Sequence, residues 1–147
     1  MRRVPPAALL LGLAGVIPFA WGAGTILVPA VGDWSLDALG RRLTGRTLLI
    51  TYGAIILSFM SGVIWGFAAR AGGEGRGRHA AALYALSTLP ALWALFLGWS
   101  AVLLALALLA LLPLDAHAQA AGLAPPWWMR LRLLLTALAV PCLAVGL

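Results

Sequence analysis

The chain contains 147 residues, of which 63% are hydrophobic and only 10% are charged, whereas about a quarter of the residues in typical soluble domains are charged. Its mean hydropathy is +1.02. A soluble domain of this size has too little interior to bury so much apolar surface. The composition therefore excludes a soluble globular fold and predicts one all-α, polytopic membrane domain over residues 1–147.

The net charge of +6 comes from arginine alone. The arginines cluster at the ends of apolar runs, which is typical of topology signals and of contacts with lipid headgroups. No basic helix or aromatic platform of the kind that reads bases is present, so no nucleic-acid partner is predicted. The single cysteine, Cys142, cannot form an internal disulfide and lies in an apolar stretch.

Five apolar runs predict five transmembrane helices, at roughly residues 5–27, 47–69, 80–97, 101–114 and 127–146. The first run resembles a signal peptide, but its length and the bulky residues at 18–21 predict that it is retained. Residues 79–114 are too long for one span and just long enough for two short ones. We expect the break between them at residues 98–100, and a single long helix is the alternative.

The longest polar connection, residues 28–46, contains a helical pattern over residues 33–43. We expect a short helix in the membrane interface there, with an ordered loop as the alternative. Seven arginines lie on the side of the N-terminus, and three, Arg41, Arg42 and Arg46, lie on the opposite side. The positive-inside rule therefore predicts a cytoplasmic N-terminus and a C-terminus on the opposite side of the membrane, which is the periplasmic side in a bacterial inner membrane.

The second span carries small residues at a four-residue spacing: Ala54, Ser58, Gly62 and Gly66. Positions four apart lie one turn above each other on a helix, so these residues form a narrow, smooth stripe. In lipid such a stripe lets another helix approach closely. We expect this span to be the packing centre of the protein and its stripe to be a packing seam, either for a sister span or for a helix of another protein.

The sequence offers little chemistry within the membrane. No ionisable residue lies near the middle of a predicted span, which disfavours a proton relay, and no histidine is placed to bind haem, so no cofactor is predicted. No metal-binding or hydrolase motif is present either. Pro18, Pro90 and Pro141 interrupt spans 1, 3 and 5, and Ser87 precedes the second of these kinks, where its hydroxyl can bind a freed carbonyl. Arg130 and Arg132 are expected to reach toward the headgroups.

Several short groups of residues in spans 1, 2, 3 and 5 form a pattern that resembles a known family. They are Pro18 with Phe19 and Ala20; Tyr52, Gly53 and Ala54; Leu57, Ser58 and Phe59; Gly62; Trp65 and Gly66; Ser87, Pro90 and Trp93; and Arg132 and Thr136 with their neighbours Leu131 and Leu135.

The pattern resembles the transmembrane protein 69-like family, also called domain of unknown function 3429. It departs from that family at Ile64, where many relatives carry a histidine. The resemblance covers nearly the whole chain and implies a small five-helix inner-membrane protein of bacterial or mitochondrial type. It implies no reaction, but it suggests a role beside respiratory or other bioenergetic complexes.

Three functions are consistent with the sequence. The leading one is a non-enzymatic accessory or assembly subunit that packs against other membrane proteins or against itself within the lipid bilayer. The second is a small homo-oligomeric carrier or binding protein for an apolar solute such as a quinone or a lipid. The third is an enzyme acting on lipid headgroups, for which His79, Asp115 and His117 are the candidate residues.

Overall fold

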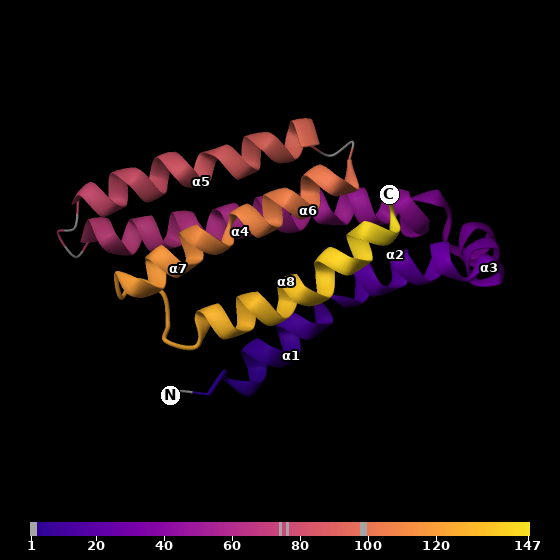
Figure 1. Ribbon diagram of the computed structural model, residues 1–147, viewed down its shortest axis with the longest axis horizontal. Coiled ribbons are helices and arrows are strands. Elements are labelled where there is room, and N and C mark those ends of the chain that lie inside the picture. The colour runs from indigo at the N-terminus through magenta and orange to yellow at the C-terminus, as the bar shows by residue number, and fades with distance from the viewer. Residues whose placement is uncertain (1–2, 74, 76, 98–99) are drawn as a thin grey trace.

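The computed structural model describes residues 3–73, 75, 77–97 and 100–147, and the regular structure within these ranges is entirely helical. Figure 1 shows the helices in chain order. Their bounds are α1 Pro6–Ala14, α2 Ile17–Leu27, α3 Pro29–Leu39, the short 3-10 helix η1 Arg41–Leu43, α4 Gly45–Gly73, α5 Gly77–Leu97, α6 Ala101–Ala110, α7 Leu112–Ala120 and α8 Trp128–Val145.

Four stretches of the described residues are helical and apolar enough to cross a membrane. They are Pro6–Leu27, Gly45–Gly73, Ala101–Ala120 and Trp128–Val145. The prediction of an all-α membrane fold is therefore confirmed. α5 has 21 residues, but its described apolar part, Ala80–Pro90, is shorter than a full span, so the fifth crossing stays a prediction. α5 ends and α6 begins on either side of residues 98–100, as the sequence predicts for two helices rather than one.

Proline divides two of the spans into shorter helices. Pro18 is near the start of α2 and Pro113 is near the start of α7, and neither can donate the backbone hydrogen bond that would continue the preceding helix. At the first break, the hydroxyl of Tyr52 on α4 donates to the carbonyl of Gly15 over 2.9 Å. The ring of Tyr52 also meets Phe19 edge-to-face at 5.0 Å. A neighbouring helix therefore satisfies a carbonyl exposed at the break.

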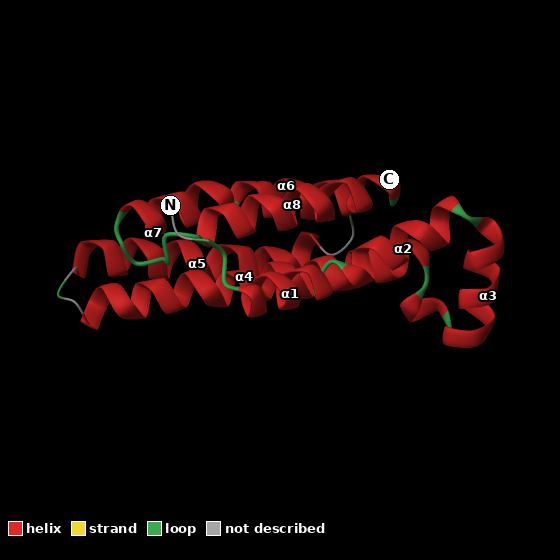
Figure 2. Cartoon of the chain, turned by 90° about the horizontal axis from the view of Figure 1, so that it is seen from below, coloured by secondary structure: helices red, strands yellow, loops and turns green. Residues whose placement is uncertain are grey.

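α4 is the central helix, as the sequence predicts. It packs against α2, α5, α6, α7 and α8. Figure 2 shows α6 and α8 lying over the layer that contains α1, α2 and α4. Because α4 has α2 and α5 as lateral neighbours and α6 over one face, its opposite face is left at the outside of the molecule.

Glycines give the close contacts in this arrangement. A Cβ atom added at Gly22 would lie 2.8 Å from Leu49 of α4, and one added at Gly146 would lie 2.9 Å from the same side chain. Leu49 is fully buried between these two glycines. Gly53 allows α4 to approach α6, since an added Cβ would lie 3.2 Å from Leu104. In lipid there is no hydrophobic driving force for helices to associate. Close van der Waals packing of this kind therefore holds membrane helices together.

The helix between the first two spans is longer at its start than the sequence predicts. α3 begins at Pro29 and ends at Leu39, because Gly40 takes a positive φ of 79° and turns the chain into η1. The indole of Trp21 donates to the carbonyl of Leu43 over 3.0 Å, which holds η1 to α2. The segment is thus ordered, and its position in a membrane interface stays a prediction.

The two ends of α4 are tied to distant parts of the chain by arginines. Arg46 Nε donates to the carbonyl of Gly146 over 3.0 Å, and Arg70 Nη1 donates to the carbonyl of Leu123 over 3.1 Å. In Figure 1 the N-terminus, the end of α4 and the α7–α8 connection lie toward one end of the molecule, and α3 and the C-terminus lie toward the other.

Candidate functional site

The first candidate surface is the small-residue face of α4, formed by Ser58, Gly62 and Gly66. All three residues are exposed, and a Cβ added at either glycine would meet no atom within 4 Å. Ser58 donates only to the carbonyl of Ala54 in its own helix. Inside the chain, α4 is packed through a different set of side chains, including Leu57 and Ile64, which are fully buried. No described atom lies near a Cβ added at Gly62 or Gly66, so a sister span does not cover this part of the predicted stripe. Ala54, the fourth member of that stripe, is half-buried and packs against the core of the chain.

Two aromatic side chains of α4, Tyr52 and Trp65, lie near the two ends of the predicted small-residue stripe and have different surroundings. Tyr52 is half-buried at the proline break described above. Trp65 is 54% exposed and its ring meets Tyr84 of α5 edge-to-face at 5.6 Å. Trp65 thus lies at the edge of the small-residue face and beside the α4–α5 contact.

The second candidate feature is a buried ion pair between α7 and α8. Arg132 Nε donates to Asp115 Oδ2 over 2.7 Å, and Trp128 Nε1 donates to Asp115 Oδ1 over 2.7 Å. Asp115 is 0% exposed and Arg132 is 4% exposed. Both carboxylate oxygens therefore accept a hydrogen bond, and the guanidinium of Arg132 balances the negative charge of Asp115 inside the protein.

Gln119 extends this cluster by one turn of α7. Its side-chain oxygen accepts from the backbone N–H of Met129 over 2.9 Å, which satisfies one of the unpaired donors at the start of α8. Asp115 and Gln119 are four residues apart on α7, and Trp128 and Arg132 are four residues apart on α8. Two short helical faces thus bind each other through matched polar groups, and we call these four residues the α7–α8 clasp.

The clasp corrects two sequence predictions. Span 4 was expected to end at Leu114 before a polar connection, but the helix continues to Ala120, because α8 satisfies the polar side chains that follow. Arg132 was expected to reach toward headgroups, but it is buried and turned toward Asp115. The described interior of this membrane protein therefore contains a carboxylate and a guanidinium. The sequence predicts Asp115 just beyond span 4, and Arg132 in the first turns of span 5 with its side chain reaching out of the membrane.

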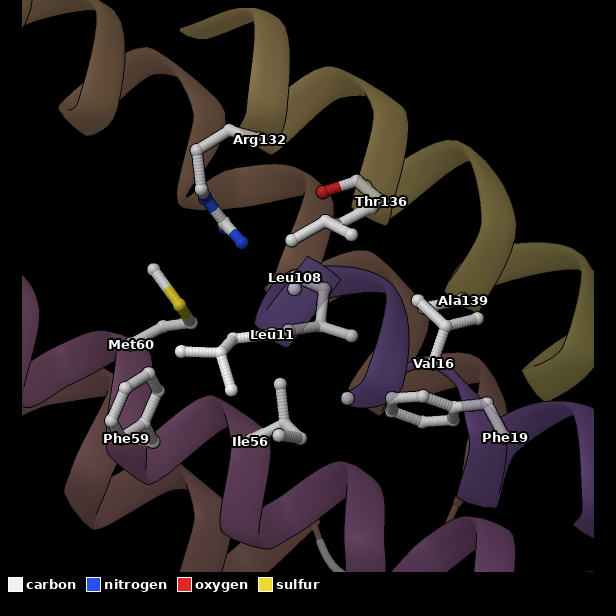
Figure 3. Close-up of a pocket in the computed structure, with 13 residues that line it drawn as sticks. Leu11, Val16, Phe19, Ile56, Phe59, Met60, Leu108, Arg132, Thr136 and Ala139 are labelled. Atoms are coloured by element: carbon white, nitrogen blue, oxygen red, sulfur yellow. The ribbon is translucent and has the colours of Figure 1, made fainter. Parts of the chain in front are cut away.

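A cavity of about 150 Å³ lies beside the clasp, between α1, α2, α4, α6 and α8. Its walls are mostly apolar, with Leu11 from α1, Phe19 from α2, Ile56 from α4 and Leu108 from α6 among them. Figure 3 shows the Arg132 side chain entering the cavity from α8 toward Leu11 and Leu108.

Two polar groups of α8 line this cavity. Thr136, one turn after Arg132, is 5% exposed and its hydroxyl lies on the side of the arginine (Figure 3). The terminal nitrogen Nη2 of Arg132 is buried and has no hydrogen-bond partner among the described residues. The cavity is thus an apolar chamber with a charged donor at one end.

The remaining predicted motif residues support the helix packing. Ser87 is buried on α5, where its carbonyl accepts from Ser61 Oγ of α4, and its own hydroxyl donates to the carbonyl of Tyr84 over 2.9 Å. The hydroxyl therefore binds a carbonyl one turn earlier in the same helix, a few residues before Pro90, which lies within α5. The side chain of Trp93 lies outside the described residues.

The residues of the predicted headgroup enzyme do not form a described catalytic group. Asp115 is buried in the clasp, whereas His117 is exposed two residues later on α7. The side chain of His79 lies outside the described residues. In the part of the chain that the structure describes, no three histidine, cysteine or acidic side chains are grouped to hold a metal ion.

Comparisons with known proteins agree with this membrane architecture. A family model described as "Protein of unknown function (DUF3429)" matches residues 4–147. The chain is also similar to transmembrane protein 69 of Xenopus tropicalis, with 38% identity over 68 residues, which is 46% of this chain and 23% of that protein. The chain thus matches about a quarter of that relative's length. No solved structure matches the chain.

Proposed function

This chain belongs to the DUF3429 family, and we propose that it is a non-enzymatic membrane protein that acts as an accessory or assembly subunit of a larger inner-membrane complex. The observation that carries the proposal is the small-residue face of α4. Ser58, Gly62 and Gly66 are exposed on the central helix, and an added Cβ at either glycine finds nothing within 4 Å. A transmembrane helix of another protein is the partner that such a smooth face fits, because two backbones can then come into van der Waals contact.

The proposed membrane arrangement has five passes, with α5 as the third. The N-terminus then lies in the cytoplasm of a bacterial cell and the C-terminus lies in the periplasm. Arginine placement supports this orientation even after Arg132 is removed from the count as a buried residue. Six arginines remain on the cytoplasmic side against three, Arg41, Arg42 and Arg46, on the other.

Leucine at both glycines of the face is expected to separate the protein from its partner. We expect the wild-type protein, tagged and extracted from its own membrane in a mild detergent, to migrate in a complex larger than its own 15.3 kDa. In Gly62→Leu/Gly66→Leu the added side chains hold the helices apart, and we expect at least tenfold less complex. No internal clash is expected at either Cβ position, so the released protein should remain folded.

The matched control is Gly24→Leu on α2, where an added Cβ also meets nothing within 4 Å. It makes the same chemical change on another helix and should leave the complex intact. A wild-type protein that migrates alone under conditions that preserve other membrane complexes would refute the proposal. Co-purification of two differently tagged copies, with no other protein, would identify the occupant as a second copy of this chain instead.

A further inference from the structure

We propose that the cavity between α1, α4 and α8 binds a neutral, apolar molecule through a carbonyl oxygen that accepts a hydrogen bond from Arg132. This site does not rest on the proposed accessory role. The first observation is the donor. Arg132 is 4% exposed, its Nε is occupied by Asp115, and its Nη2 is buried without a partner among the described residues. A buried charged donor without an acceptor is costly, so a ligand that supplies one is stabilised.

The second observation is the balance of charge, which selects the chemistry of the acceptor. Asp115 already neutralises Arg132 and also accepts from Trp128. An anionic ligand such as a carboxylate would bring an uncompensated negative charge into a low-dielectric site, which is strongly unfavourable. A neutral carbonyl oxygen completes the hydrogen bonding of the guanidinium without adding charge. Thr136, four residues along the same face of α8, offers a second polar contact.

The third observation is the shape and access of the cavity. Its volume of about 150 Å³ equals that of an engineered apolar cavity in another protein that binds benzene, so a single substituted ring or a short acyl segment fits. Leu11 and Phe59 both line the cavity and are 75% and 64% exposed, respectively. Its mouth therefore opens at the side of the helix bundle, where apolar membrane molecules are the available ligands.

Two membrane compounds carry this chemistry: the ring of a quinone and the ester carbonyl of a phospholipid acyl chain. The test uses a simpler matched pair of probes. Acetophenone and α-methylstyrene have the same planar shape, but only acetophenone carries a carbonyl oxygen. Binding is measured by ligand-detected NMR titration of the full chain in nanodiscs of ether-linked phospholipid, which lack ester carbonyls.

We expect the wild-type protein to bind acetophenone at least about tenfold more tightly than α-methylstyrene, which is the difference that one hydrogen bond to a charged donor gives. Ala139→Leu fills the cavity while leaving Arg132 and Asp115 in place, so it should lower the affinity for both probes. Asp115→Leu/Arg132→Met removes the donor together with its counter-charge and should abolish only the preference. The signal that remains with Ala139→Leu measures the probe dissolved in the lipid, and it is subtracted from the wild-type signal.

Equal affinity of the wild type for the two probes would overturn the proposal, as would binding that Ala139→Leu leaves unchanged. Two further arms distinguish the natural sources. Weaker acetophenone binding in ester-linked nanodiscs assigns the site to phospholipid carbonyls. Displacement of acetophenone by decylubiquinone in the ether-linked nanodiscs assigns it to a quinone.

Discussion

Replacing Asp115 with leucine is expected to destabilise the folded protein by about 3–5 kcal/mol, the usual cost of removing one partner from a buried ion pair. The change leaves the guanidinium of Arg132, 4% exposed, without a counter-charge. It also removes the acceptor of the Trp128 indole, which donates to Asp115 Oδ1 over 2.7 Å. The free energy of unfolding is measured by equilibrium denaturant titration in mixed micelles.

The double variant Asp115→Leu/Arg132→Met should recover most of this loss, because a well-packed apolar pair of similar volume often replaces a buried ion pair without net cost. Asp37→Leu on α3 is the matched control, since Asp37 is exposed and its removal should change stability by less than about 0.5 kcal/mol. If the single and double variants lose equal stability, the α7–α8 clasp does not depend on charge pairing.

The second large effect is expected from Gly22→Ala on α2. The new Cβ would lie 2.8 Å from both Cγ and Cδ2 of Leu49, and Leu49 cannot move away because Gly146 closes on its other side. We expect a loss of about 1–3 kcal/mol, as for other overpacked interiors. Gly62→Ala makes the same change in open space on α4 and should be neutral or gain up to about 1 kcal/mol from helix propensity.

A double-mutant cycle tests the stated cause of this effect. In a Leu49→Ala background the clash at residue 22 is absent, so Gly22→Ala should cost much less there than in the wild-type chain. A cost of Gly22→Ala that is the same in both backgrounds would show that Leu49 is not the obstacle.

Much of the fold follows from the sequence because the membrane restricts it so strongly. Apolar runs of span length must be helical, and polar or small residues such as Ser100 mark where they end. The central position of α4 is confirmed, but the prediction rested on the stripe of small residues that begins at Ala54, whereas the close approach to α6 is made at Gly53. The predicted end of span 4 is wrong. The helix continues through Asp115 to Ala120, because groups of α8 donate hydrogen bonds to the polar side chains of this segment.

The candidate sites were harder to predict for two physical reasons. α4 is apolar around its whole circumference, so no polar side marks which face is turned away from the bundle, and the exposure of Gly62 could not be read from periodicity. Asp115 and Arg132 are 17 residues apart and each follows or begins an apolar run, so each alone is typical of an interface. The available signal was the matched four-residue spacing of Asp115 with Gln119 and of Trp128 with Arg132.

The central claim is that another membrane protein covers the small-residue face of α4, and photocrosslinking in the native membrane tests it most directly. A photoreactive p-benzoylphenylalanine replaces Trp65, an aromatic side chain that is 54% exposed at the edge of this face, so both glycines stay in place. In a control chain it replaces Leu133, which is 53% exposed on α8. We predict that residue 65 forms a covalent adduct with a distinct protein and that residue 133 labels mainly lipid. Lipid adducts alone at residue 65 would contradict the account.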